Sequence, residues 1–242
     1  MHLLQTHCTG IVLERRHVRR VWTARPPWRN AGAMTRVKIC GLKDPDLVRL
    51  CAAEGADWIG FVFVEASPRY VTPEAAETLL LGVGRSVPVA LLADADDALI
   101  ERIIATGIRV LQLHGQETPE RVADIAKRTG CEVWKALGVE TADDLAGAEV
   151  FAAADRLLID AKPPKDADRT GGHGQAFDWS ILKGWTAPKP WILAGGLTPE
   201  NVAEAIAATG ATAVDVSSGV ERLRGLKDKE LVRAFLRAAK EV

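Results

Sequence analysis

A cysteine closes the first convincing apolar strand of the chain, in the run Arg36–Gly41 (RVKICG). A thiolate can act as a base or as a nucleophile, so Cys40 is a candidate catalytic residue. The alternative is a small buried apolar residue, as free cysteines often are. We expect a nearby lysine or helix N-termini to lower the pKa of the thiol from about 8.5, and Lys38 shares a strand face with it.

An aspartate closes a second apolar run, Leu157–Asp160 (LLID). A carboxyl group at the end of an apolar strand is partly desolvated, which favours its protonated form and suits a general acid. Asp160 could instead cap the following loop or pair with an inward lysine, for which Lys38 and Lys135 are the candidates. The sequence leaves these interpretations of Asp160 open.

Glycines and serines follow two later apolar runs and predict a phosphate site. Glycines allow backbone N–H groups to approach an anion closely, and serine hydroxyls add donors. Either group alone would indicate a tight turn, but as a pair after the seventh and eighth strands they favour phosphate. The candidate phosphate-binding residues are Gly195, Gly196, Asp215, Ser217, Ser218 and Gly219.

Three further side chains could contact a substrate. Arg69 lies in a loop after the second strand, where its guanidinium could bind a carboxylate bidentately, or could simply be solvated. His114 ends the fourth strand and is a candidate binding or acid–base group, although satisfaction by the local backbone is the favoured interpretation. His173, within Gly171–Gly174, is predicted to lie in a mobile loop that covers the site.

Eight short apolar runs alternate with amphipathic stretches from Met34 onward, and each is typical of a strand buried on both faces. The runs are Arg36–Cys40, Asp57–Val64, Val87–Leu92, Ile108–His114, Cys131–Leu137, Arg156–Asp160, Pro190–Ala194 and Ala211–Val216. A capping residue followed by proline predicts a helix start at Asp44, Thr72, Thr118 and Thr198.

This alternation predicts an α/β fold, a single (β/α)8 TIM barrel. A doubly wound open sheet is the alternative, which the absence of a GxGxxG motif at Gly41–Lys43 disfavours. Active sites of such barrels lie at the carboxyl ends of the strands. That rule selects Cys40, His114 and Asp160, together with the two glycine–serine loops, as the site.

Composition excludes several function classes. The 242 residues are 48% hydrophobic and 26% charged with a net charge of −1, which gives no case for nucleic-acid or membrane binding. No apolar run approaches the roughly 20 residues that span a bilayer. The four cysteines show neither CxxC pairing nor zinc-like spacing, so we expect a reducing compartment, the cytoplasm, and no metal.

The first 33 residues differ from the rest, with six arginines against one acid, Glu14. They lack the apolar core of a secretory signal and contain no serine, which weakens a transit-peptide interpretation. We interpret residues 1–33 as a start-site artefact or a dispensable, disordered tail, with organelle targeting as the alternative. The catalytic barrel is then expected to span 34–242.

The chain from Met34 to about Lys240 resembles the phosphoribosylanthranilate isomerase family of tryptophan biosynthesis. The resemblance rests on motifs that occur in the family's order across nearly the whole barrel. They are VKICGLKD (37–44), GADWIGFVF (55–63), SPRYVTPE (67–74), LQLHGQE (111–117), LLID (157–160), GGHGQAFDW (171–179), AGGLTPENV (194–202) and VDVSSGVE (214–221).

The resemblance implies a cofactor-free Amadori rearrangement of N-(5-phosphoribosyl)anthranilate to 1-(o-carboxyphenylamino)-1-deoxyribulose 5-phosphate. It implies that Asp160 is the general acid, that Cys40 is the general base and that Arg69 binds the anthranilate carboxylate. The two C-terminal loops match the phosphate site. The only partner expected is this small molecule, bound by a monomer or a homodimer. His173 and the long insert Pro163–Arg169 depart from the family's pattern. Both lie in the sixth loop, so they affect the expectation that this loop closes over the substrate and leave the expected chemistry unchanged.

Two alternatives remain beside this function. The first is a barrel that also isomerises the related aminoaldose of histidine biosynthesis. The resemblance argues against it, because those isomerases have an aspartate where Cys40 stands. The second is a phosphate-ligand-binding barrel without catalysis, or a regulatory partner in a pathway complex. The presence of both Cys40 and Asp160 disfavours it, since a retired active site need not keep either residue.

Overall fold

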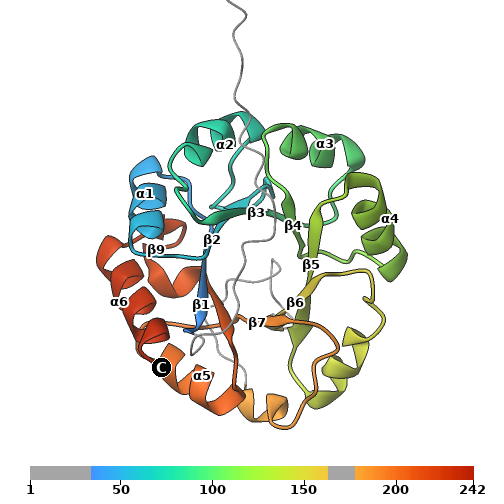
Figure 1. The fold of residues 1–242 in the computed structure, drawn as a ribbon, viewed down its shortest axis with the longest axis vertical. Helices are drawn as coiled ribbons and strands as arrows, with labels where there is room; N and C mark the ends of the chain where they lie inside the picture. The colour runs from blue at the N-terminus through green and yellow to red at the C-terminus, as the bar shows by residue number, and fades with distance from the viewer. Residues whose placement is uncertain (1–33, 163–177) are drawn as a thin grey trace, which may run out of the picture.

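The structure is a computed structural model that describes residues 34–162 and 178–242. The described residues form a closed ring of eight parallel strands, β1 to β8 in chain order (Figure 1). The ring closes through β1 and β8, where Arg36 pairs with Ala213 and Ile39 with Val216. The strands are β1 Arg36–Cys40, β2 Trp58–Val62, β3 Val87–Leu92, β4 Val110–Leu113, β5 Glu132–Val139, β6 Arg156–Ala161, β7 Trp191–Leu193 and β8 Ala213–Val216. This confirms the TIM barrel and excludes the open sheet.

Helices lie outside the ring (Figure 1) and cover its apolar outer face. The α-helices are α1 Pro45–Ala53, α2 Pro73–Leu80, α3 Asp97–Ala105, α4 Pro119–Thr129, α5 Val202–Thr209 and α6 Lys229–Lys240. The 3₁₀ helices are η1 Ala142–Ala148, η2 Trp179–Leu182 and η3 Ser218–Val220. The connection between β5 and β6 therefore contains a 3₁₀ helix where the simple alternation predicts an α-helix. Within the part of the chain described, no helix combines the length and apolarity needed to span a membrane.

Three of the four predicted helix starts are confirmed. The side chains of Asp44, Thr72 and Thr118 each accept a hydrogen bond from a backbone N–H in the first turn of their helices. The start predicted at Thr198 is wrong. The chain makes a turn there, in which Asn201 Oδ1 accepts from the Thr198 N–H at 2.8 Å, and α5 begins only at Val202.

Successive strand residues alternate between the helix-facing side and the barrel interior. The interior holds an apolar cluster of strand residues that includes Trp58 and Trp134, whose rings meet edge to face at 5.3 Å. Two residues further along β6 from the clustered Leu158 lies Asp160, and two further along β8 from Ala213 lies Asp215. The interior is therefore apolar in its middle part, with Arg36 and Arg156 lying over the Trp58 ring from below, and becomes polar toward the carboxyl ends of the strands.

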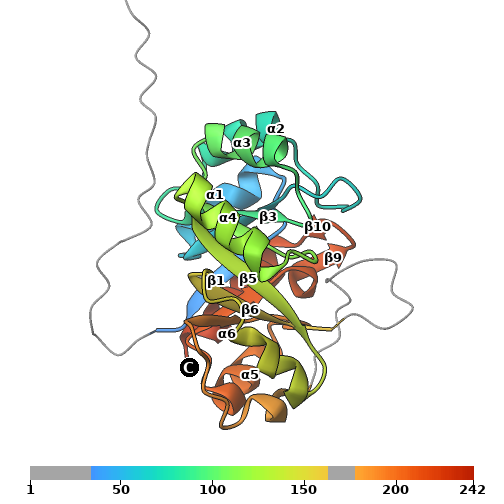
Figure 2. The ribbon, with the colours of Figure 1, turned by 90° about the vertical axis from the view of Figure 1, so that its right-hand side faces the viewer.

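A short antiparallel hairpin follows β8 and was not among the predicted strands. It consists of β9 Glu221–Leu223 and β10 Leu226–Lys227. Figure 2 shows it beside the barrel, at the end where β6 leads out of the ring. The predictions for residues 1–33, for Pro163–Arg169 and for His173 fall outside the described residues.

Candidate active site

Asp160 and His114 meet at the carboxyl ends of β6 and β4. His114 Nε2 lies 3.2 Å from Asp160 Oδ2, and His114 Nδ1 lies 3.0 Å from Gln112 Nε2. The expectation that local backbone satisfies the His114 ring is therefore wrong. Gln112 lies two residues before His114 and shares its strand face, so a side chain takes that position. The imidazole is held from both sides and in turn orients the Asp160 carboxyl group.

Neither predicted lysine pairs with Asp160. Lys38 Nζ contacts Asp215 Oδ1 at 2.9 Å, whereas Lys135 Nζ contacts Glu117 Oε2 at 2.9 Å, outside the barrel interior. The loop-capping alternative holds in part, because Asp160 Oδ1 accepts from the Ala161 N–H at 2.9 Å. The Asp160 side chain remains 13% exposed. It can therefore reach a bound molecule while its second oxygen contacts His114.

Two cavities lined by the described residues adjoin Asp160. The larger, about 510 Å³, extends over the loops after β4, β5 and β6 and is also lined by His114, Lys135, Phe151 and Lys162. The smaller, about 40 Å³, lies between the loops after β7 and β8. Asp160 lines both cavities and lies at the carboxyl end of β6. It can therefore act on a ligand that extends from one cavity into the other.

Cys40 lies at the end of β1 and is 2% exposed. Its strand neighbour is Gly60, where an added Cβ would lie 2.9 Å from the Cys40 sulfur, so glycine leaves the room the thiol occupies. Burial raises the pKa of the thiol, and the charge of Lys38 opposes that rise without cancelling it. The predicted lowering of the Cys40 pKa is thus wrong, because desolvation outweighs the lysine.

The two predicted phosphate loops pack against each other and line the smaller cavity. A Cβ on Gly219 would lie 1.8 Å from the Leu197 carbonyl oxygen, so only glycine permits this approach. Gly195 has a φ of +84°, and a Cβ there would lie 2.4 Å from the Ala161 nitrogen. Ser217 Oγ donates to the Cys40 carbonyl at 3.2 Å. The predicted residues Gly195, Gly196, Asp215, Ser217, Ser218 and Gly219 all line this cavity.

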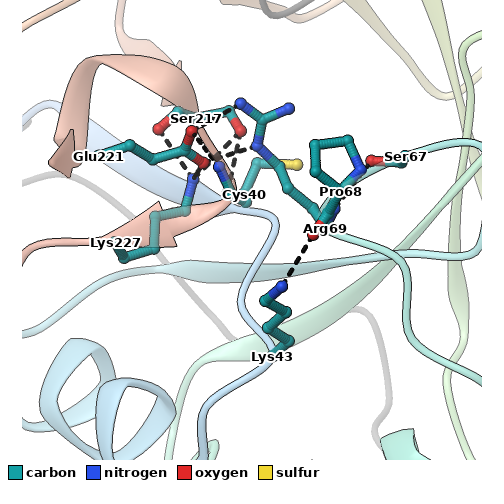
Figure 3. A network of polar contacts seen from close by, with 9 residues as sticks. Cys40, Lys43, Ser67, Pro68, Arg69, Ser217, Glu221 and Lys227 are labelled. Carbon is teal, nitrogen blue, oxygen red and sulfur yellow. Dashed lines mark hydrogen bonds and ion pairs between the residues drawn. The ribbon is translucent and has the colours of Figure 1, made fainter. Parts of the chain in front are cut away.

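Arg69 crosses the loop that follows Cys40 and is 7% exposed, so the solvated-loop alternative is wrong. Gly41, with a φ of +80°, lies under its stem, and a Cβ there would be 2.4 Å from Arg69 Cδ. The guanidinium binds Glu221 through Nε at 2.6 Å and Nη2 at 2.8 Å (Figure 3). The glycine after Cys40 therefore provides the space through which the Arg69 side chain reaches Glu221.

The sequence interpretation missed Glu221, Lys227 and Gln112. Glu221 ends the motif VDVSSGVE, so an acid directly after a phosphate loop was the available signal. Gln112 could have been found from its position two residues before His114 on the same strand face. The role of Lys227 could not be predicted from the sequence, because no apolar pattern indicates the hairpin in which it lies. In residues 34–162 and 178–242, no group of three or more His, Cys, Asp or Glu side chains could hold a metal ion.

The closed parallel barrel, with titratable side chains and an anion-sized cavity at the strand ends, defines the class of TIM-barrel enzymes. Residues 37–238 match the family model of N-(5'-phosphoribosyl)anthranilate isomerase. The chain belongs to this family and is an isomerase.

Relatives and solved structures agree with this family. The N-(5'-phosphoribosyl)anthranilate isomerase of Hyphomonas neptunium is 67% identical over 207 residues, covering 86% of this chain and 98% of the relative. That of Rhodospirillum rubrum is 55% identical over 215 residues, with the same coverage. The crystal structure of phosphoribosyl anthranilate isomerase from Thermotoga maritima is similar with a TM-score of 0.78 at 35% identity, covering 86% of this chain and all of that one.

Proposed function

We propose that this protein converts N-(5'-phosphoribosyl)anthranilate to 1-(o-carboxyphenylamino)-1-deoxyribulose 5-phosphate by an Amadori rearrangement in L-tryptophan biosynthesis. The observation that carries the proposal is the convergence of Asp160, Cys40 and the small cavity at one end of the barrel. The family relationship supports the substrate. So does a similar structure, 32% identical with a TM-score of 0.73, of an isomerase in complex with reduced 1-(o-carboxyphenylamino)-1-deoxyribulose 5-phosphate.

In the first step Asp160 acts as general acid. It gives its proton to the furanose ring oxygen as the bond from that oxygen to C1′ breaks, and the anilino nitrogen supplies the electron pair that forms the Schiff base. The contact from His114 fixes the carboxyl group, and the exposed fraction of Asp160 lets its proton reach the ligand. A positioned acid of this kind contributes about 10²- to 10⁴-fold in rate.

In the second step Cys40 acts as general base. Its thiolate removes the C2′ proton of the protonated Schiff base, the electron pair forms an enolamine, and tautomerisation of the enolamine gives the ketone product. No covalent bond to sulfur is needed, because only a proton is transferred. Lys38 favours the thiolate that this step requires, while burial and Asp215 oppose it.

The remaining residues bind the substrate. Arg69 is proposed to bind the anthranilate carboxylate, and His114 to contact the ligand beside Asp160. The backbone of Gly195, Gly196 and Gly219 and the hydroxyl of Ser218 are proposed to bind the phosphate. The Ser217 hydroxyl, which donates to the Cys40 carbonyl, is proposed to turn its proton to the phosphate. We propose that the protein works without a cofactor on this small molecule, in the cytoplasm, as a monomer or a homodimer.

The test is a steady-state assay of the purified full-length chain, with loss of the substrate's fluorescence as the readout. We expect turnover without added metal or cofactor. A folded sample that shows no turnover would contradict the proposal and favour the non-catalytic barrel. The histidine-pathway aminoaldose serves as a second substrate in the same assay. We expect no conversion of it, and conversion would support the dual-substrate alternative.

A further inference from the structure

Glu221 occupies only one of the two edges of the Arg69 guanidinium. A guanidinium has five N–H donors and can bind a carboxylate along two different edges. Glu221 binds the edge formed by Nε and Nη2, at 2.6 and 2.8 Å. No hydrogen bond joins Nη1 to any of the residues that the structure describes. Among these residues, the edge formed by Nη1 and the second Nη2 proton has no hydrogen-bond partner.

Glu221 is held firmly enough to orient that free edge. Its side chain is 4% exposed, and its oxygens also accept from Lys227 Nζ at 2.8 Å and from the Gly225 N–H at 2.9 Å. Burial would raise the pKa of Glu221, but the Arg69 hydrogen bonds and the Lys227 charge outweigh burial and lower this pKa to about 2. The carboxylate therefore stays ionised across the working pH range.

Lys227 decides the net charge of this group. Two cations, Arg69 and Lys227, share one carboxylate in a poorly solvated place. Burial lowers the pKa of Lys227, and the charge and hydrogen bond of Glu221 oppose this lowering. With Lys227 protonated, the three side chains together carry one positive charge. Without Lys227, the Glu221 charge would cancel that of Arg69 and would repel an incoming anion. An attraction for a substrate carboxylate thus depends on a lysine that need not touch the substrate.

The same lysine connects this group to the phosphate loop. Lys227 Nζ donates to the Ser217 carbonyl at 2.8 Å and to Ser217 Oγ at 3.2 Å. Ser217 Oγ in turn donates to the Cys40 carbonyl at 3.2 Å. Figure 3 shows these side chains gathered around the end of the strand that carries Cys40. One hydrogen-bonded chain thus runs from Arg69 to the phosphate loop and to the backbone of Cys40.

We propose that Glu221 and Lys227 are positioning residues that select a substrate bearing a carboxylate: Glu221 orients the free edge of Arg69, and Lys227 preserves its charge. The inference rests on the proposed role of Arg69 in binding the anthranilate carboxylate. Glu221→Gln is the sharpest variant, because it keeps the shape of the side chain. Its amide nitrogen would face either Nε or Nη2 of Arg69, donor against donor, so the guanidinium has to turn away.

The experiment measures by calorimetry how strongly each full-length variant binds two ligands. One is the reduced 1-(o-carboxyphenylamino)-1-deoxyribulose 5-phosphate, and the other is its 1-phenylamino counterpart without the carboxyl group. The ratio of the two affinities isolates carboxylate recognition from general damage to the fold. We expect this ratio to be about tenfold smaller in Glu221→Gln and in Lys227→Met than in the wild type. Glu221→Asp, which keeps the charge, should recover part of it.

Glu74→Gln is the matched control, because Glu74 pairs with Arg102 on the exposed surface of α2. Its affinity ratio should equal that of the wild type. An unchanged ratio in folded Glu221→Gln, with a reduced ratio in Arg69→Ala, would overturn this inference and leave the proposed function intact. An unchanged ratio in Arg69→Ala itself would overturn the role proposed for Arg69 and the inference with it. In steady state, Glu221→Gln should raise KM more than it lowers kcat.

Discussion

At the scale of single residues, the environment of Cys40 determines how the proposed base can work. The thiol is buried between Lys38, which favours its charged form, and Asp215, which opposes it. Lys38 itself is buried; burial lowers its pKa, but Asp215 and Cys40 outweigh burial and raise it, so the lysine stays charged. A fixed positive charge beside a buried thiol reduces the cost of forming the thiolate at the moment when the substrate needs a base.

Replacing Lys38 by methionine should change the pH dependence of activity. The substitution removes the charge that lowers the Cys40 pKa and leaves Asp215, which raises it. The rise of kcat/KM with pH should therefore move to higher pH, and a thiol pKa that is higher by about one would lower kcat/KM at neutral pH by about tenfold. The double variant Lys38→Met with Asp215→Asn removes both charges and should move the profile only part of the way back, because Lys38 affects the thiol pKa more than Asp215 does. A profile that does not move in the single variant would contradict the proposed role of Lys38.

The residue types at the site were largely predictable, and their contacts were not. Cys40 and Asp160 stand at the ends of apolar strands, which sequence patterns reveal. Their partners depend on the register of neighbouring strands in the closed ring. The register of β1 against β8 places Lys38 beside Asp215, and Asp160 contacts His114 instead. The spacing of residues along one strand does not indicate which side chain of another strand each of them contacts.

At the scale of elements, the loops after β7 and β8 function as one unit because their backbones touch. Gly219→Ala should push the Leu197 carbonyl away and separate the loops, since the added Cβ would lie 1.8 Å from that oxygen. We expect the affinity for inorganic phosphate, measured by calorimetry, to fall by about tenfold or more. Gly147→Ala is the control, because nothing lies within 4 Å of a Cβ there. Equal phosphate affinity in the two variants would argue against a phosphate site at these loops.

The strands were easier to predict than the connections between them. Val87–Leu92 has the predicted ends because a strand buried on both faces is apolar throughout. Arg36–Cys40 also has the predicted ends, although its buried Lys38 departs from that pattern. The helix start at Thr198 was predicted too early, because Asn201 has a φ of −112°, outside the helical range, so the regular helix begins only at Val202. The hairpin Glu221–Lys227 was missed because buried ion pairs, rather than an alternating apolar face, hold it against the barrel.

At the scale of the whole molecule, the same ion pairs should make stability depend on acid. Glu221 has a pKa of about 2 in the folded protein, against an ordinary value of 4.5. It therefore contributes stability that is complete above about pH 4.5 and is lost as the pH falls toward 2. The difference in unfolding free energy between wild type and Glu221→Gln, measured in urea, should shrink over that range. A difference that stays constant from about pH 5 to about pH 2.5 would rule out this linkage.

The barrel should not need the first 33 residues. Its ring closes through strand pairing that begins at Arg36, and the family match begins at residue 37. A chain of residues 34–242 is expected to keep kcat and KM within about twofold of the full-length protein and to unfold at a similar temperature. Calorimetric melting and the fluorescence assay measure both. A truncated chain that folds but loses turnover would show that the preceding segment contributes to the site.

In the proposed mechanism Asp160 opens the sugar ring and Cys40 then removes the C2′ proton. The most direct test is the deuterium isotope effect on kcat, with substrate deuterated at C2′, in Cys40→Ser and Asp160→Asn. Each variant should lose about 10²- to 10⁴-fold in kcat with a smaller change in KM. We predict a large isotope effect in Cys40→Ser, because proton removal becomes the slow step. We predict almost none in Asp160→Asn, because ring opening becomes the slow step there. The reverse pattern, or near wild-type kcat in Asp160→Asn, would contradict this mechanism.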